Sequence, residues 1–201
     1  MKKEKLKIKD IITAVLLTIV NLVIYFVLAF LCVNPILLLV YPFLVSLLQG
    51  IVYMMLGIRV PKSGAFLIYG IIFGVTGVYL PYIIGFLLTG ILAEILLKNF
   101  GYKNCKALTI SYIVMQIVCC FTGTIYPYVI ALNSTIEKYE SMARDTTIYV
   151  KANELMSVPV IILLLALTAV AAFVGAKLGE RIVRKHMTGA NQATIEEDEE
   201  K

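Results

Sequence analysis

Residues 11–58 read IITAVLLTIVNLVIYFVLAFLCV, then NP, then ILLLVYPFLVSLLQGIVYMMLGI, without one charged side chain. A helix needs about 20 apolar residues to cross a hydrocarbon core of ~30 Å. The two runs, 11–33 and 36–58, both reach that length. This stretch therefore predicts two consecutive membrane-spanning helices.

The rest of the chain has the same character. In the whole chain of 201 residues, 60% are hydrophobic and 15% are charged. A soluble domain has about 45–50% apolar and roughly 25% charged residues. Further apolar runs cover residues 65–78, 80–97, 107–132 and 158–183. Backbone groups in lipid must bond within their own segment, which favours helices. We expect an all-α integral membrane bundle of six transmembrane helices that forms one domain over residues 1–201.

The turn between the third and fourth runs is the weak point of this topology. The turn would consist of Val78-Tyr79-Leu80, and Gly77 and Pro81 on either side are its only turn-forming residues. Without a turn there, the two runs merge into one overlong helix.

The basic residues predict the orientation. With six spans, fifteen of the 18 Lys and Arg residues lie on the side of both termini, and only Lys138, Arg144 and Lys151 lie opposite. Because cytoplasmic loops are enriched in Lys and Arg, both termini are expected on the cytoplasmic side of the membrane. Residues 133–157 then form an external loop, and 186–201 an acidic cytoplasmic tail. The first span is too long for a signal-peptide core, so we expect the basic N-terminus to be an anchor.

The motifs of several enzyme classes are missing. The chain has no GxxxxGK[ST] loop for ATP phosphates, no HExxH and no CxxC, and His186 is its one histidine. We therefore expect no enzymatic activity, no metal site and no cofactor. Glu94 is an acidic residue near the end of the fourth predicted span, and Lys98 follows it at the i+4 spacing of a helical ion pair. The sequence favours an interfacial Glu94–Lys98 pair.

Small residues recur at helical spacing in three spans. Gly70 and Gly74 mark the third span, and Ala171, Gly175 and Gly179 mark the sixth. Small residues let helices approach closely in lipid, and most such stripes are contacts within a bundle. Ala14 and Thr18 have the same spacing on the first helix. They are candidates for docking a partner.

The external loop predicts a binding site. Loops of this length in compact proteins are usually functional, and Ser134-Thr-Ile-Glu137 is a capping-box pattern for a helix start. Pro127 removes a backbone hydrogen bond in the fifth span, where it opens a pocket. The candidate substrate-binding residues, aromatic or amide side chains near this end, are Tyr82, Gln116, Tyr126, Tyr128 and Asn133. Two alternatives stay open: tyrosines that line the lipid interface, and a deeper site near Asn21 and Gln49.

Three stretches resemble a known family. They are KIKDIITAVLLTIVNLVIYF (residues 7–26), GAFLIYGIIFGVTG (64–77) and LTGILAEILLKNFGYKNCKALTISY (88–112). Together they resemble the Trep_Strep, or MptD-type, family of bacterial membrane proteins, over roughly residues 1–190. Members are regarded as S components of energy-coupling factor (ECF) transporters.

The resemblance implies a mechanism. An S component captures a small vitamin-like substrate outside the cell and has no ATPase of its own. It docks on a transmembrane coupling subunit that two cytoplasmic ATPases carry. Related proteins dock through Ala-x-x-x-Ala in the first helix, and Ala14 and Thr18 match it with one departure. The substrate does not follow from the resemblance. The alternatives are a small homo-oligomeric permease and a membrane scaffold without a ligand.

Overall fold

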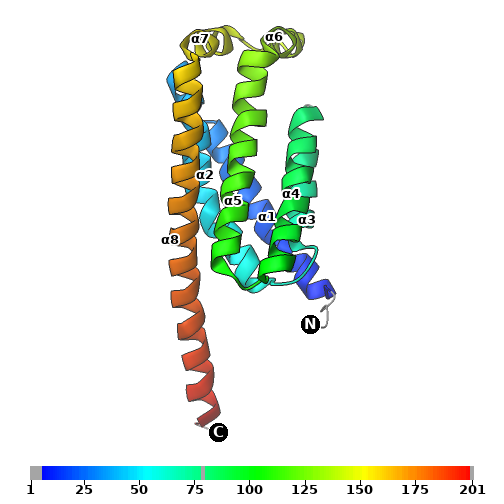
Figure 1. The fold of residues 1–201 in the computed structure, drawn as a ribbon, viewed down its shortest axis with the longest axis vertical. Helices are drawn as coiled ribbons and strands as arrows, with labels where there is room; N and C mark the ends of the chain where they lie inside the picture. Colours follow the sequence, from blue (N-terminus) through cyan, green and yellow to red (C-terminus); the bar gives the residue numbers. More distant parts are fainter. Residues whose placement is uncertain (1–5, 78–79, 200–201) are drawn as a thin grey trace.

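We describe the protein from a computed structural model, which covers residues 6–77 and 80–199, with the side chains of 186–199 excepted. Within those ranges all regular structure is helical. The elements are α1 (Ile8–Ala29), α2 (Pro35–Arg59), α3 (Ala65–Val75), α4 (Leu80–Phe100), α5 (Cys105–Cys120), the π-helix η1 (Phe121–Ile130), α6 (Leu132–Ser141), α7 (Thr147–Leu155) and α8 (Val158–Glu199). Figure 1 shows the long helices side by side, with α6 and α7 lying across one end.

Five helical stretches in the described residues are long and apolar enough to cross a membrane. They are α1, α2, α4, the continuous Cys105–Ile130 stretch and Val158–Lys185 of α8. The predicted third span is instead the 11-residue helix α3. At 1.5 Å per residue α3 extends about 16 Å, roughly half of a ~30 Å core. The described residues therefore contain five helices of spanning length and one short helix, where the sequence predicts six spans.

Local sequence explains where several helices begin. Asn34 accepts a hydrogen bond from the Leu37 amide at 2.8 Å, and Pro35 occupies the first position of α2, where its missing N–H costs nothing. Asn104 caps α5 through the amides of Lys106 and Ala107. The predicted capping box at Ser134 is wrong. Helix α6 begins at Leu132, and the Ser134 hydroxyl donates to the Ala131 carbonyl at 3.0 Å.

Helices α3 and α4 are separate helices that pack closely. A Cβ added to Gly70 would lie 2.7 Å from the Phe86 carbonyl oxygen, and one added to Gly90 3.0 Å from the Phe66 oxygen. The Gly70–Gly74 stripe is therefore an internal contact. Residues 78–79 of the expected turn lie outside the described residues. The merger into one overlong helix is excluded, because α4 begins at Leu80 and packs back on α3.

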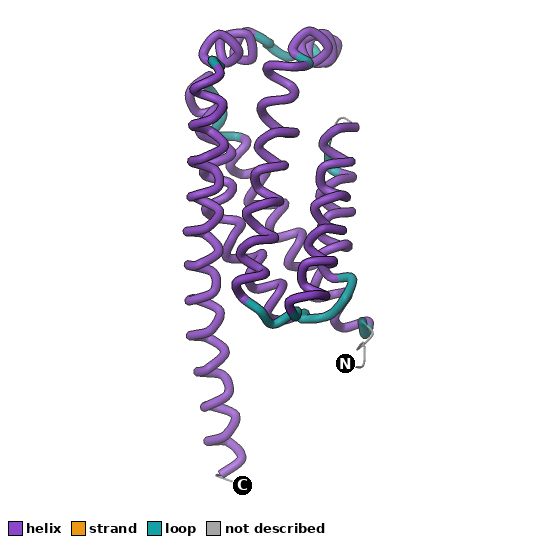
Figure 2. Tube along the Cα trace, in the orientation of Figure 1, coloured by secondary structure: helices purple, strands orange, loops and turns teal. Residues whose placement is uncertain are grey.

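The small-residue stripe of α8 packs on α2. A Cβ on Gly175 would lie 2.4 Å from the Leu47 oxygen, and one on Gly50 2.4 Å from the Gly175 carbonyl carbon. Ala171, Ala172 and Ala176 of the same stripe are buried. The expectation of a contact within the bundle is confirmed here. Helix α8 then continues without a break through the predicted tail to Glu199 and projects past the bundle (Figures 1 and 2).

The two ends of the bundle differ in charge. The start of α1, the α2–α3 and α4–α5 connections and the projecting half of α8 share one end, and α6 and α7 lie at the other (Figure 1). The first end carries Arg59, Lys62, Lys98, Lys103, Lys106 and the basic residues of α8 from Lys177 onward. Lys138, Arg144 and Lys151 belong to the α6–α7 segment. The structure thus separates the basic residues along the bundle as the sequence pattern requires.

Candidate functional site

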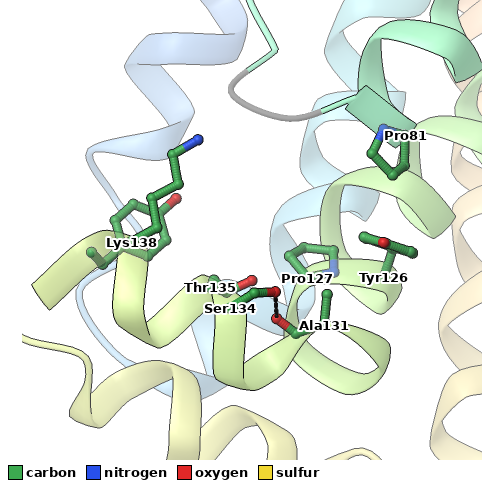
Figure 3. A pocket seen from close by; sticks show the side chains of 8 residues that line it. Pro81, Tyr126, Pro127, Ala131, Ser134, Thr135 and Lys138 are labelled. Atoms are coloured by element: carbon green, nitrogen blue, oxygen red, sulfur yellow. Dashed lines mark hydrogen bonds between the residues drawn. The ribbon is translucent and has the colours of Figure 1, made fainter. Parts of the chain in front are cut away.

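A pocket of about 200 Å³ lies at the end of the bundle that carries α6. Its walls come from the start of α4, the second half of η1 and one side of α6. The lining residues are Pro81, Tyr126, Pro127, Ala131, Ser134, Thr135, Lys138 and Tyr139. In Figure 3 the Lys138 side chain faces Pro81, Pro127 and Tyr126 across an open space. One side of the pocket is therefore polar, and the other is apolar and aromatic.

Two tyrosines of the π-helix η1 point to different places, because residues two apart on a helix do not face each other. The Ala131 amide donates to the Tyr126 carbonyl at 2.8 Å, an i→i+5 bond. Such turns are rare and occur frequently at functional sites. They also change the angular spacing of side chains from that of an α-helix. Tyr126 lines the pocket, whereas Tyr128 is 9% exposed and packs against α7.

Three stacked tyrosines join η1, α6 and α7. The Tyr128 and Tyr149 rings lie 5.2 Å apart and nearly parallel, and the Tyr149 and Tyr139 rings lie 4.8 Å apart. The Arg144 guanidinium lies 5.8 Å from the centre of the Tyr139 ring, and Asn153 Nδ2 donates to the Tyr128 carbonyl at 2.8 Å. Burial raises the pKa of the Tyr149 hydroxyl to about 12. These contacts hold α6 and α7 against the pocket.

A second polar group lies inside the bundle. Buried amides and hydroxyls of α1, α2, α3 and α5 form a chain of hydrogen bonds. The bonds run from Gln116 Nε2 to Gln49 Oε1 (3.2 Å), from Gln49 Nε2 to the Asn21 carbonyl (3.0 Å), from Asn21 Nδ2 to the Tyr69 hydroxyl (3.2 Å) and from Ser46 Oγ to Gln116 Oε1 (3.2 Å). Asn21 Oδ1 has no hydrogen-bond donor among the described residues. This is the deeper location near Asn21 and Gln49, and its geometry fits interhelical hydrogen bonding.

The five predicted substrate-binding residues do not meet at one place. Tyr126 is the one that lines the pocket. Tyr82 is 3% exposed and packs on Phe86, with ring centres 4.7 Å apart. Gln116 belongs to the internal hydrogen-bond chain. Asn133 is exposed on the first turn of α6, and Tyr128 belongs to the tyrosine stack.

The predicted docking residues are inside the bundle. Ala14 and Thr18 are each 0% exposed, and the Thr18 hydroxyl donates to the Ala14 carbonyl at 2.7 Å. The opposite face of α1 is the exposed one, where Leu16 is 57% exposed. In this conformation Ala14 and Thr18 contact the protein's own helices and leave no surface for a partner.

Glu94 has a different partner from the one that the sequence favours. Its Oε1 accepts from the Phe66 amide at 3.0 Å, and its Oε2 from the Tyr102 hydroxyl at 2.8 Å. The Phe66 amide belongs to the first turn of α3, where backbone N–H groups lack intrahelical partners. Lys98 is exposed. Glu94 therefore caps a neighbouring helix rather than pairing with Lys98.

Sequence reasoning missed most of the pocket wall. Ala131, Ser134, Thr135 and Lys138 lie three or four residues apart, which places them on one face of α6. That spacing in the sequence could have indicated this face of α6 as a pocket wall. The contribution of Pro81 depends on how α4 packs beside η1, which no local pattern reports.

Comparison with known proteins gives one match. The profile of the family described as hypothetical bacterial integral membrane proteins (Trep_Strep) matches residues 8–188. No curated protein and no solved structure matches the chain. The match covers most of the sequence, so the chain belongs to the Trep_Strep family of bacterial integral membrane proteins.

Proposed function

We propose that this member of the Trep_Strep family is the S component of an ECF-type importer. It captures a small vitamin-like molecule outside the bacterial plasma membrane and delivers it inward with ATP-driven partners. The observation that carries this proposal is the pocket at one end of a membrane bundle, between the π-helix and α6. The pocket combines aromatic and apolar walls with a few polar groups, which is typical of small-ligand sites.

The charge distribution supports an outward-facing pocket. The basic residues gather at the end of the bundle that holds both termini, and the α6–α7 end has three. Because Lys and Arg are enriched in cytoplasmic segments, the α6–α7 end is external under this proposal. An importer captures its substrate on that side.

Energy for transport comes from partners under this proposal. The chain has no phosphate-binding GxxxxGK[ST] loop, and its role is to bind rather than to catalyse. A transmembrane coupling subunit and two cytoplasmic ATPases supply the ATP-driven step. We assign Ala14 and Thr18 to packing of α1 inside the bundle, because both are fully buried.

Untargeted mass spectrometry of small molecules that copurify with the full-length protein tests substrate capture. We expect a compound that is enriched with the wild type and reduced at least about tenfold with Tyr126→Ala, a loss of about 1.4 kcal/mol. Phe100→Ala is the control, because Phe100 is 64% exposed and ends α4 at the opposite end of the bundle. A scaffold predicts no copurifying compound. A compound that both variants retain equally would place the binding site outside this pocket.

A further inference from the structure

We infer that the pocket takes a small anion with a flat apolar body, of the class of aromatic or heteroaromatic carboxylates and phosphates. This inference rests on the proposed capture of a small molecule at this site, and it adds the chemical class of that molecule. The four observations that carry it are the charge of the lining, the surrounding charges, the separation of polar and apolar walls, and the size of the pocket.

The lining of the pocket carries a positive charge. Among its eight residues in the described part of the chain, Lys138 is the one that is charged at neutral pH, and none is a carboxylate. The Lys138 side chain is partly buried and faces the apolar wall across the opening (Figure 3). A cation beside low-dielectric walls attracts an anionic ligand more strongly than one in open water.

The charges around the pocket add to this preference. The Arg144 guanidinium lies 5.8 Å from the ring centre of Tyr139, which lines the pocket. Of the nearby carboxylates, Glu137 and Glu140 are exposed on α6 and do not line the pocket. The Asp145 carboxylate accepts from the Thr147 amide at 2.9 Å. None of these three carboxylates lines the pocket, whereas Lys138 does.

The opposite wall favours a flat ring. Pro81, Pro127 and Tyr126 lie together on the side that faces Lys138 (Figure 3). Proline rings and a tyrosine face offer apolar contact area for an aromatic body. A ligand with an acid group at one end and a ring at the other would reach both walls at once.

The volume limits the size of the ligand. Pockets for drug-sized ligands have about 300–1,000 Å³, and this pocket has about 200 Å³. A single substituted ring matches that space better than a large cofactor. The acid group then belongs to a free molecule, and the headgroup of an anionic lipid is the alternative that the test separates from it.

The test uses three probes of one shape with full-length protein in phosphatidylcholine nanodiscs. Benzoate, benzyl alcohol and benzylamine are compared by saturation-transfer NMR at concentrations up to about 10 mM, where ligands of this size still give signals. We expect benzoate to bind at least about tenfold more tightly than the other two. Lys138→Met should weaken benzoate binding about tenfold, and Lys151→Met, an exposed lysine of α7, should not.

Four results would overturn the inference. They are equal binding of benzylamine or benzyl alcohol, equal losses in the two lysine variants, no benzoate binding at the highest concentration, and displacement of benzoate by phosphatidylglycerol in the nanodisc. The last result would assign the site to a lipid headgroup. All four results are measured on the isolated chain, without ATPase partners. The anionic ligand class can therefore fail while the proposed S-component role stands, and the reverse also holds.

Discussion

At the scale of single residues, glycines decide how closely α2 and α8 approach. A Cβ on Gly175 would lie 2.4 Å from the Leu47 oxygen, inside the closest distance that carbon atoms tolerate. In contrast, a Cβ on Gly123 would lie 3.6 Å from the Tyr82 ring, an ordinary contact. At Gly175 the backbone of α2 fills the space that a side chain would need, whereas at Gly123 that space is open enough for a methyl group.

We expect Gly175→Ala to destabilise the protein and Gly123→Ala to keep or raise its stability, by up to about 1 kcal/mol. In a helix, Gly→Ala normally stabilises by about 1 kcal/mol, whereas overpacking costs about 1–3 kcal/mol. At Gly175 the steric cost exceeds the gain, because backbone rather than a flexible side chain blocks the space. Thermal unfolding in detergent measures both variants. A higher melting temperature for Gly175→Ala would show that the helices can separate without cost.

Glu94 provides a second residue-scale prediction. Because it accepts from the Phe66 amide and the Tyr102 hydroxyl, Glu94→Ala leaves a helix terminus without its acceptor. We expect a loss of about 1–3 kcal/mol in the free energy of unfolding, and almost none for Lys98→Ala, whose side chain is exposed. Equal losses for both substitutions would instead support the Glu94–Lys98 ion pair.

At the scale of elements, the tyrosine stack holds α6 and α7 over the pocket. Tyr149 is the middle ring, between Tyr128 and Tyr139. Buried residues are absent from α6, and α7 has one, Ala152. With so little burial, these helices depend on the stack for their position.

We expect Tyr149→Ala to increase amide hydrogen exchange in α6 and α7 and to leave the long helices unchanged. Each aromatic pair contributes about 0.5–1.5 kcal/mol beyond its buried area, and this substitution removes two pairs. Val150→Ala is the control, because Val150 is the next residue and is 38% exposed. Unchanged exchange in Tyr149→Ala would mean that other contacts hold the two helices.

The packing of α1 can be tested in the same way. Ala14 is 0% exposed and Leu16 is 57% exposed on the same helix. Ala14→Trp should lower the melting temperature and the folded yield. An indole in a fully buried site overpacks it, at a cost of about 1–3 kcal/mol or more. Leu16→Trp should be tolerated. If Ala14→Trp is as stable as the wild type and only partner binding is lost, then Ala14 is a docking residue after all.

The elements show what the sequence could and could not predict. Apolar runs located the long helices within a few residues, because their length is fixed by the bilayer. The small-residue spacing of Ala14 and Thr18 predicted close packing but not its partner, since internal and external contacts use the same spacing. Tyr126 and Tyr128 were expected to share one site. Residues two apart on a helix do not face each other, so their spacing in the sequence already argued against a shared site.

At the scale of the whole molecule, the polar and charged groups are sorted by depth. Amides such as Gln49 and Gln116 bond to each other inside the bundle, and most basic residues lie at the end that holds the termini. The pocket lies at the opposite end. This arrangement suits a protein that binds a molecule at one face of the membrane and meets its partners at the other.

Copurification from native membranes tests the proposed role most directly. The full-length protein, tagged and extracted in mild detergent from cells that express an ECF module, is analysed by mass spectrometry for bound subunits. The account predicts a transmembrane coupling subunit together with two ATPase subunits, in stoichiometric amounts. Recovery of the protein alone or as a homo-oligomer, while the module itself is intact in the same extract, would contradict it.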